Sequence, residues 1–279
     1  MQNISKTLIQ SFYKPRAKEV HKGTFGHALV IAGSRGKMGA AVLATKACMR
    51  SGVGLITAFI PKCGYDILQT SVPEVMVIES ESENHLSGKI DVNEFSVVGM
   101  GCGIGKHTQT AELLKHMLST CKVPLVLDAD ALNILSENKT WLRKLPANSV
   151  LTPHPKEFER LFGKTKNRQE AIQLQQQKAK ELNCIIVLKG ANTSIAKTKK
   201  VYQNTTGNAG MASAGMGDVL TGIITGIVAQ GYTTEKAAIM GVYLHGLAGD
   251  LAVKKLSQES LIASDVIDHL PLAFRETLY

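Results

Sequence analysis

The chain has 279 residues, of which 44% are hydrophobic and 20% are charged, and its net charge is +9. This length and apolar content predict a large buried core and exclude a disordered or repetitive chain. No apolar run approaches the roughly 20 residues that a membrane helix needs. No signal-peptide pattern opens the chain, so we expect a cytoplasmic protein with no membrane partner.

Charge and cysteine content narrow the class of partner. The five cysteines are scattered and form no C-x-x-C pair, which predicts reduced thiols that pack as small hydrophobic side chains. The basic surplus favours anionic partners such as nucleotides or phosphorylated metabolites. Lys197, Lys199 and Lys200 form a tight cluster in a predicted hairpin. No interleaved aromatic residues or recognition helix accompany the cluster, so no nucleic-acid partner is expected.

Short apolar runs alternate with longer helical stretches along the chain. The predicted strands cover residues 27–32, 55–60, 96–98, 125–127, 150–151, 185–188, 193–196 and 201–203. The predicted helices cover residues 40–51, 108–118, 169–182 and most of the chain from 217 onward. Most strand runs are apolar without alternation, as is typical of strands buried on both faces. We therefore predict an α/β fold in one domain, 1–279, with a mainly parallel central sheet and helices on both faces.

Polar or glycine-rich segments follow the predicted strands. They are GSRGKMG (33–39), GMGCGIG (99–105), DADALN (128–133), TPHPKE (152–157) and KGANT (189–193). Ligands of such sheets bind beyond the carboxyl ends of the strands. These segments therefore predict one ligand site to which several loops contribute.

The most informative segment is GNAGMASAGMGD (207–218), which precedes an apolar helix. Its glycines allow several N–H groups to point one way, and with the helix N-terminus they predict a phosphate-binding cradle. Asp218 lies in the first helical turn, where it either accepts a proton from an attacking hydroxyl or caps the helix. The density of glycines favours the catalytic interpretation.

Segment 33–39 lies between a strand and a helix but matches neither G-x-G-x-x-G nor G-x-x-x-x-G-K-[ST]. This excludes a dinucleotide-binding Rossmann motif and a P-loop. The segment is either a substrate loop or a tight turn. Asp128, Asp130 and Asn133 either bind a hard cation or cap the helix that follows, with Asp130 as the expected cap.

Three further positions have both a structural and a functional interpretation. His154 and Glu157 lie in a loop stiffened by two prolines, which suits ligand contact, although isolated residues of this kind are more often structural. Lys189 either brings a cation to a phosphate or is an ordinary surface lysine. His245, within a predicted helix, is expected to be packed or to cap.

Taken together, the motifs resemble the ribokinase-like superfamily, and within it the ADP- or ATP-dependent NAD(P)H-hydrate dehydratase family. The resemblance rests on LVLDADALN (125–133), LTPHPKEFERL (151–161), VLKGANT (187–193) and GNAGMASAGMGDVLTGIITG (207–226), which occur in the family's order. It extends from Lys22 to the last predicted helix. Two positions depart from the family pattern, since Ala209 replaces a common Pro and Met216 a common Thr.

The resemblance implies a lyase of metabolite repair, which phosphorylates the S form of hydrated NADH or NADPH and then eliminates phosphate. ADP is the implied phosphoryl donor, Mg²⁺ accompanies it without assigned protein ligands, and a homotetramer is the implied assembly. Asp218 is the implied base. The resemblance assigns the nucleotide to Lys189, Gly190, Ala191, Asn192, Thr193 and Gly217, the hydrate to Ala40, Gly103, His154 and Asp218, and the phosphate cradle to Ala214, Gly215, Met216 and Gly217.

Two other functions remain open from the sequence. A kinase of the same superfamily would use the same aspartate to phosphorylate a hydroxymethyl-pyrimidine or hydroxyethyl-thiazole alcohol. A nucleotide-sensing protein without activity would need the glycine loop but no base, and the presence of Asp218 counts against it.

Overall fold

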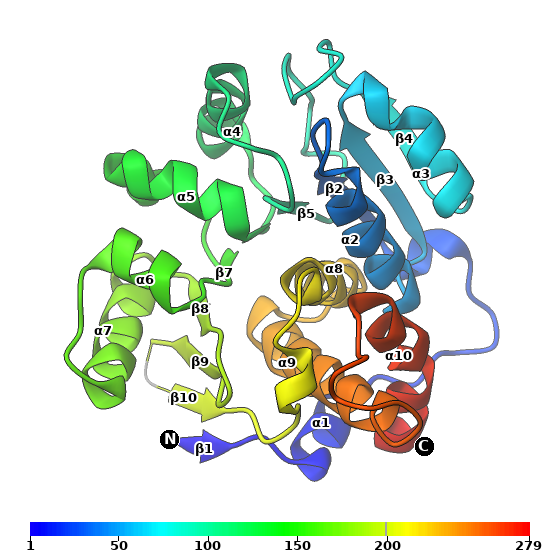
Figure 1. Cartoon of the computed structure of the whole chain (residues 1–279), viewed down its shortest axis with the longest axis vertical. Helices are drawn as coiled ribbons and strands as arrows, with labels where there is room; N and C mark the ends of the chain where they lie inside the picture. Colours follow the sequence, from blue (N-terminus) through cyan, green and yellow to red (C-terminus); the bar gives the residue numbers. More distant parts are fainter. Residues whose placement is uncertain (199) are drawn as a thin grey trace.

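The computed structural model describes residues 1–198 and 200–279, which form a ten-stranded sheet with helices around it (Figure 1). The strands are β1 (Gln2–Asn3), β2 (His27–Ile31), β3 (Leu55–Ile60), β4 (Met76–Glu79), β5 (Val97–Met100), β6 (Leu125–Leu127), β7 (Val150–Leu151), β8 (Ile185–Leu188), β9 (Ser194–Lys197) and β10 (Lys200–Gln203). Their order is β1-β10-β9-β8-β7-β6-β5-β2-β3-β4. Strand β9 is antiparallel to β8 and β10, whereas the other pairs are parallel. This confirms the predicted mainly parallel sheet.

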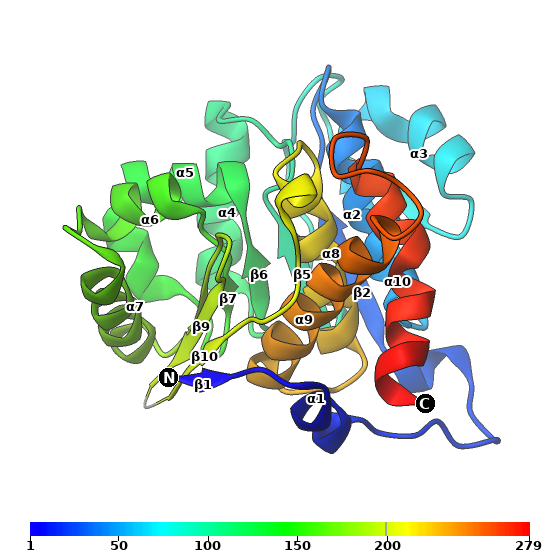
Figure 2. The same ribbon diagram turned by 60° about the horizontal axis from the view of Figure 1, so that its bottom comes forward.

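Helices cover both faces of the sheet (Figure 2). They are α1 (Lys6–Phe12), α2 (Met38–Arg50), α3 (Tyr65–Ser71), α4 (Thr108–Thr120), α5 (Ala129–Glu137), α6 (Pro155–Phe162), α7 (Arg168–Glu181), α8 (Met216–Ala229), α9 (Thr234–Ala252) and α10 (Ala263–Leu278). Along β2, Ala28 and Val30 join the core under α2, α8, α9 and α10. Leu29 and Ile31 join the second core, under α4 to α7. Strand side chains alternate between faces, so the unbroken apolar run fills two cores.

Helix α8 lies in the middle of the molecule, between the sheet and helices α2 and α9 (Figure 1). A side chain at Gly222 would overlap the backbone of Ala44 in α2, and one at Gly226 would meet the carbonyl oxygen of Cys48 at 2.5 Å. The two glycines therefore let α2 and α8 pack backbone to backbone. This packing fixes the N-terminus of α8, where the glycine-rich loop ends.

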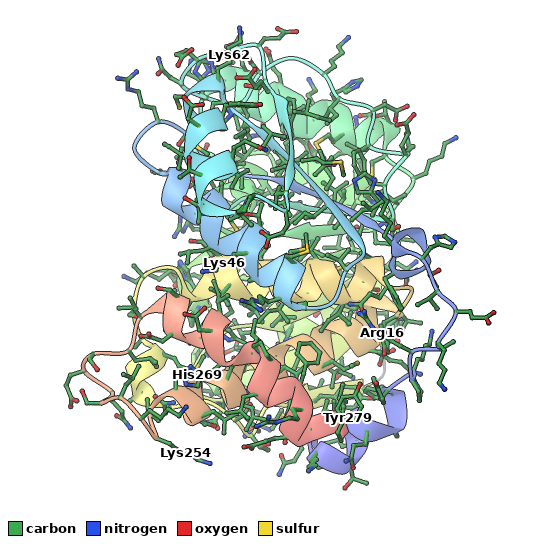
Figure 3. All side chains as sticks on the ribbon, turned by 90° about the vertical axis from the view of Figure 1, so that its right-hand side faces the viewer. Arg16, Lys46, Lys62, Lys254, His269 and Tyr279 are labelled. Carbon is green, nitrogen blue, oxygen red and sulfur yellow. The ribbon has the colours of Figure 1, made fainter. Side chains whose placement is uncertain are left out.

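The outer helix α10 packs on α2, and Lys46 of α2 forms an ion pair with Asp268 of α10 at 3.9 Å (Figure 3). At the end of the chain, the hydroxyls of Tyr279 and Tyr13 are 2.7 Å apart. Within the described residues, no helix is both long enough and apolar enough to cross a membrane. All five cysteines are free, and Cys48, Cys102 and Cys184 are buried, as predicted.

Some elements differ from the prediction. Helix α6 was predicted as a proline-stiffened loop, but Pro155 is its first residue, a position that needs no N–H donor. The edge strand β4 was not predicted, although residues 75–78 (VMVI) form a short apolar run. As an edge strand it leaves Met76 and Ile78 exposed. The predicted basic hairpin exists as β9 and β10, which pair Lys197 with Lys200. Its third lysine, Lys199, lies outside the described residues.

Candidate functional site

A cavity of about 460 Å³ lies where β6, β7 and β8 end and α8 begins. Its lining includes Asp128, His154, Glu157, Lys189, Gly215, Gly217 and Asp218. In Figure 2 the yellow segment that leads into α8 rises between the green helices and the orange α9. The structure therefore brings together polar residues from four of the predicted loops, at the expected edge of the sheet.

Asp128 is the most deeply buried acidic group of the site, with a relative exposure of 1%. Lys189 donates a hydrogen bond to its Oδ1 at 2.5 Å, and Thr221 donates to its Oδ2 at 2.9 Å. Burial disfavours the charged form of Lys189, but the carboxylates of Asp128 and Glu157 outweigh this and raise its pKa. Lys189 is therefore a fixed cation rather than an ordinary surface lysine.

The predicted helix cap at Asp130 is wrong. Helix α5 begins two residues earlier than expected, and Asp128 caps it by accepting the Ala129 N–H at 2.8 Å. Asp130 instead accepts the Gly105 N–H at 2.8 Å and lies 3.6 Å from the Lys37 ammonium. It thus ties the loop after β5 to the loop before α2.

Asp218 lies in the first turn of α8 and lines the same cavity as the ion pair of Lys189 and Asp128. Burial raises its pKa to about 6, an effect that the Asp128 charge adds to, while a hydrogen bond with Cys102 and the charge of Lys189 oppose it. The helix cap is Gly215, which supplies no side-chain hydrogen bond. Capping is therefore not the role of Asp218. A carboxylate with a pKa near 6 is suited to accept a proton at neutral pH.

The loop before α8 has the backbone of an anion site. Gly215 has a φ of +87°, and a side chain there would lie 2.6 Å from Leu43 and 2.9 Å from Ala263. The first N–H groups of a helix have no acceptor within it, and the Val219 N–H is the first to bond back, to Gly215. The N–H groups of Met216 and Gly217 can therefore bind a negatively charged group, with the helix dipole in favour.

Gly217 differs from Gly215, because its backbone is helical and any residue could adopt it. A glycine is needed at this position only to keep the space beside it free of a side chain. A Cβ at Gly217 would lie 3.3 Å from Asp128 Oδ2 and 3.4 Å from Lys189 Nζ. We therefore expect Gly217→Val to fold but to weaken ADP binding, because its methyl groups fill the space above this ion pair. Calorimetric titration with ADP measures the effect, and Gly39→Val, at the same position in the first turn of α2, is the control. A side chain at the exposed Gly39 would meet open space. Unchanged ADP affinity in Gly217→Val would contradict the assignment of this space to a phosphate.

His154 caps α6, and its ring is held in one orientation. The Nδ1 atom accepts the N–H groups of Lys156 and Glu157 at 3.1 and 3.3 Å, and Glu157 accepts the His154 N–H at 2.8 Å. Burial lowers the pKa of His154, and the charges of Lys189 and Arg160 lower it further. The neutral ring therefore carries its proton on Nε2, which lies 3.4 Å from Glu157 Oε1 and is the ring's hydrogen-bond donor at the edge of the cavity.

A second pocket of about 480 Å³ adjoins the first on the side of α9. The predicted nucleotide residues Lys189, Gly190, Ala191, Thr193 and Gly217 line it, with Asn204, Thr206, Gly207, Asn208, Met211, Leu220, Val242 and His245. Asn192 instead lies along the neighbouring hollow beside α7, where its carbonyl accepts a hydrogen bond from Arg168 at 2.6 Å. Lys189, Gly190 and Gly217 line both pockets, so the pockets meet at Lys189.

Ala40 and Gly103 lie beside each other but not in the lining of either pocket. Gly103 has a φ of +65°, and a side chain there would lie 2.9 Å from the Ala40 side chain. Cys102, the residue before Gly103, lies close enough to Asp218 for its thiol to lower the pKa of that carboxyl. The predicted hydrate residues therefore form two groups, one at Asp218 and His154 and one at the loop after β5.

Two contributors to the site were not predicted. Thr221 is three residues after Asp218 on α8, and this spacing, which places both on one side of a helix, was the available signal. Cys102 had no signal beyond its place at a strand end.

His245 has a buried Nε2 without a hydrogen-bond partner in the described part of the chain, and burial lowers its pKa to about 4. It is therefore a neutral, packed side chain.

Among the described residues, no group of three or more His, Cys, Asp or Glu side chains is placed to hold a metal ion. The acidic groups at the junction, Asp128 and Asp218, are too few for a protein-made cage. They fit a magnesium ion that arrives on a nucleotide and keeps phosphate and water ligands.

Comparison with known proteins identifies the family. The family model described as NAD(P)H-hydrate dehydratase matches residues 28–272. A bifunctional NAD(P)H-hydrate repair enzyme of Moorella thermoacetica is 40% identical over 91% of this chain, but the match spans 50% of that protein. The chain spans about half the length of the bifunctional relatives it matches. An ADP-dependent (S)-NAD(P)H-hydrate dehydratase of Neisseria meningitidis is 39% identical over 86% of this chain and 81% of its own.

Solved structures agree on the fold. The ADP/ATP-dependent NAD(P)H-hydrate dehydratase of Bacillus subtilis, co-crystallized with ATP/Mg²⁺, has a TM-score of 0.86 at 28% identity, with 99% of this chain and 98% of that chain covered. A hydroxyethylthiazole kinase of Pyrococcus horikoshii has a TM-score of 0.65 at 14% identity, covering 91% and 92%, which shows a shared ribokinase-like fold alone. With its family model matched along most of its length, this chain belongs to the NAD(P)H-hydrate dehydratase family.

Proposed function

We propose that this chain dehydrates the S form of hydrated NADH and NADPH, with ADP as phosphoryl donor and AMP and phosphate as by-products. The observation that carries the proposal is the position of Asp218, a base with a pKa of about 6, where two pockets meet at Lys189. The relatives that this chain matches over 81–95% of their own length are named ADP-dependent (S)-NAD(P)H-hydrate dehydratase, and this name supports the proposed substrate and phosphoryl donor. In this proposal the nucleotide occupies the pocket beside α9, and the reacting end of the hydrate occupies the cavity at His154.

In this proposal the reaction has two steps, phosphorylation of the hydrate and elimination of phosphate. Asp218 takes the proton of the hydrate hydroxyl, whose oxygen then attacks the terminal phosphorus of ADP, and AMP leaves. The N–H groups at the start of α8 and the Lys189 ammonium hold the phosphoryl oxygens where negative charge develops. The new phosphate ester is a better leaving group than hydroxide. Loss of phosphate from the ester, together with loss of a proton from the neighbouring ring carbon to solvent, restores the double bond and yields NADH or NADPH.

Magnesium belongs to the same proposal. When bound with ADP it would neutralise charge on the phosphates, and Asp128 and Asp218 are the carboxylates near enough to the phosphoryl path to contact it or its waters. Lys189 neutralises Asp128 directly, so the protein already balances one of these charges itself.

His154 is proposed to donate its Nε2 proton to the hydrated nicotinamide. We expect His154→Asn to raise the KM for the hydrate by about tenfold, the value of one lost hydrogen bond of roughly 1.4 kcal/mol, and to leave the KM for ADP nearly unchanged. Asn still caps a helix, so α6 is retained. His269→Ala, on the outer side of α10 (Figure 3), is the control. A rise confined to the KM for ADP would contradict the assignment.

The decisive test is to incubate the protein with hydrated NADH and ADP and to follow the return of reduced-nicotinamide absorbance. Recovery of NADH with one phosphate and one AMP per turnover is expected. A stable phosphate ester would favour a kinase of the same fold, and ADP binding without any product would favour a nucleotide sensor. Running the assay with ATP and with hydrated NADPH defines the donor and substrate preference.

We further propose that residues 1–279 form one catalytic domain that acts in the cytoplasm as a homotetramer, without nucleic-acid or membrane partners. The continuous ten-stranded sheet supports the first point. Exposed apolar side chains on the edge of that sheet, Met76 and Ile78 of β4 with Tyr65 and Ile67 of α3, support assembly between copies. Sedimentation equilibrium tests the assembly.

A further inference from the structure

The wall of the nucleotide pocket that faces α9 is formed by residues 204–212, here called the pocket wall. It has no regular structure except a single turn at Ala209–Met211. Thr206 donates a hydrogen bond to the Tyr243 carbonyl of α9 at 2.8 Å, and Asn204 donates to the Thr206 carbonyl at 2.8 Å. The pocket wall therefore depends on α9 for its position.

Two glycines of α9 bring that helix into direct contact with the pocket wall. A Cβ at Gly246 would lie 2.7 Å from the carbonyl carbon and oxygen of Thr206. A Cβ at Gly249 would overlap the side chain of Met211. Since these separations leave no room for a side chain, the surface of α9 is fitted to the pocket wall.

Asp250, the next residue of α9, makes two further contacts with the pocket wall. Its Oδ2 accepts the Gly207 N–H at 2.8 Å, and its Oδ1 accepts the Asn208 side-chain N–H at 2.9 Å. Asn208 in turn accepts the Gly210 N–H at 3.0 Å and so caps the turn that carries Met211. Gly207 has a φ of +104°, one of several backbone conformations open to glycine, and the hydrogen bond from its N–H to Asp250 selects it.

We infer that Asp250 is a positioning residue for nucleotide binding. Its carboxylate locks Gly207 and Asn208 and, through them, the turn at Met211, so that the pocket is formed before the nucleotide enters. A preformed pocket spares the ligand the cost of ordering these residues. Asp250 lines neither pocket, so it sets nucleotide affinity without taking part in phosphoryl transfer. The inference rests on the proposed function in that the pocket beside α9 holds ADP.

The experiment compares Asp250→Ala and Asp250→Asn with Asp268→Ala, a control at an α10 carboxylate whose Lys46 partner is 3.9 Å away on α2. ADP binding is titrated by calorimetry without hydrate, and steady-state kinetics give both KM values and kcat. We expect the ADP dissociation constant to rise about tenfold or more in Asp250→Ala, as for loss of hydrogen bonds to a charged group. Asp250→Asn, which keeps one acceptor oxygen, should lie between. The KM for the hydrate and kcat should stay within a few-fold of the parent.

Two results would overturn the inference: unchanged ADP affinity in both variants, or an equal rise in the KM values for ADP and hydrate. If Asp250→Ala does not fold, Asp250→Asn alone decides, with circular dichroism as the check on folding. Failure of the proposed function gives a different result, namely a parent protein that binds ADP but restores no NADH. The ADP titration then still tests Asp250.

Discussion

Replacement of Asp218 by Asn should lower turnover of the hydrate by about 10² to 10⁴-fold, the usual effect of removing a general base. Asn has nearly the same size but cannot accept the hydroxyl proton. ADP affinity should hold or rise, because a negative charge next to the phosphates is removed. The assay is NADH recovery under single-turnover conditions, with ADP binding measured separately by calorimetry.

The same substitution should stabilise the protein, which distinguishes a base from a structural residue. Burial raises the pKa of Asp218 from 3.8 to about 6, so the folded state binds this proton more tightly than the unfolded state. Asp218 therefore lowers the free energy of unfolding as the pH rises from about 4 to 6, and the cost persists at neutral pH. Asn removes that cost, which is about 3 kcal/mol at about 1.4 kcal/mol per pH unit. Thermal unfolding at pH 5 and pH 8 measures it.

Asp66→Asn is the matched control, because Asp66 also lies in the first turn of a helix but is exposed on α3. It should change neither turnover nor stability by much. In the parent, the single-turnover rate should fall about tenfold per pH unit below about 6, where Asp218 becomes protonated. Turnover of Asp218→Asn within a few-fold of the parent would remove Asp218 from the catalytic role.

The position of Asp218 could be predicted from sequence because its signals are local. A glycine-rich segment directly precedes a long apolar helix, and that order alone places a phosphate cradle and an acidic first turn together. The central strands were predictable for the same reason. Strands β2, β3, β6 and β8 are short apolar runs buried on both faces, and such runs need no knowledge of their neighbours.

The charge pairing of the site could not be predicted, because its partners are distant in sequence. Lys189 is 61 residues from Asp128, and Thr221 is 93 residues from it. The pairing of β6, β7 and β8 brings Lys189 to Asp128, and the packing of α8 against β6 brings Thr221 to it. Local pattern also misplaced the cap of α5, because Asp128 and Asp130 are equally good capping residues and the strand end decides between them.

The buried pair of Asp128 and Lys189 leads to the prediction with the largest effect on stability. Asp128 is 1% exposed and the Lys189 side chain is 20% exposed. Asp128→Asn leaves the ammonium with the Glu157 carboxylate at 4.0 Å as its remaining acidic partner. Breaking one side of a buried pair typically costs about 3–5 kcal/mol. We expect a loss of this size in the free energy of unfolding, and a loss of turnover because Lys189 is no longer held at the phosphoryl path.

The pH dependence and a double-mutant cycle separate this effect from simple loss of packing. The carboxylates raise the pKa of Lys189, so the pair contributes stability below the ordinary lysine pKa and loses it as the pH rises through the higher folded value. In Asp128→Asn only Glu157 still opposes the effect of burial on the ammonium, so Lys189 becomes neutral at a lower pH than in the parent. The difference in stability between parent and variant should therefore shrink as the pH rises toward 10.

Adding Lys189→Met to Asp128→Asn should restore part of the lost stability, since no unpaired charge then remains buried. The surface pair of Lys106 and Glu137 is the matched control, because its atoms are also 2.5 Å apart while both side chains are at least half exposed. Glu137→Gln should cost about 1 kcal/mol or less. Equal losses for Asp128→Asn and Glu137→Gln, with no recovery in the double variant, would show that burial of the pair does not couple Lys189 to Asp128. The turnover of the double variant then distinguishes the two roles of Lys189: recovery of stability without recovery of rate is expected, because Met cannot hold the phosphoryl oxygens.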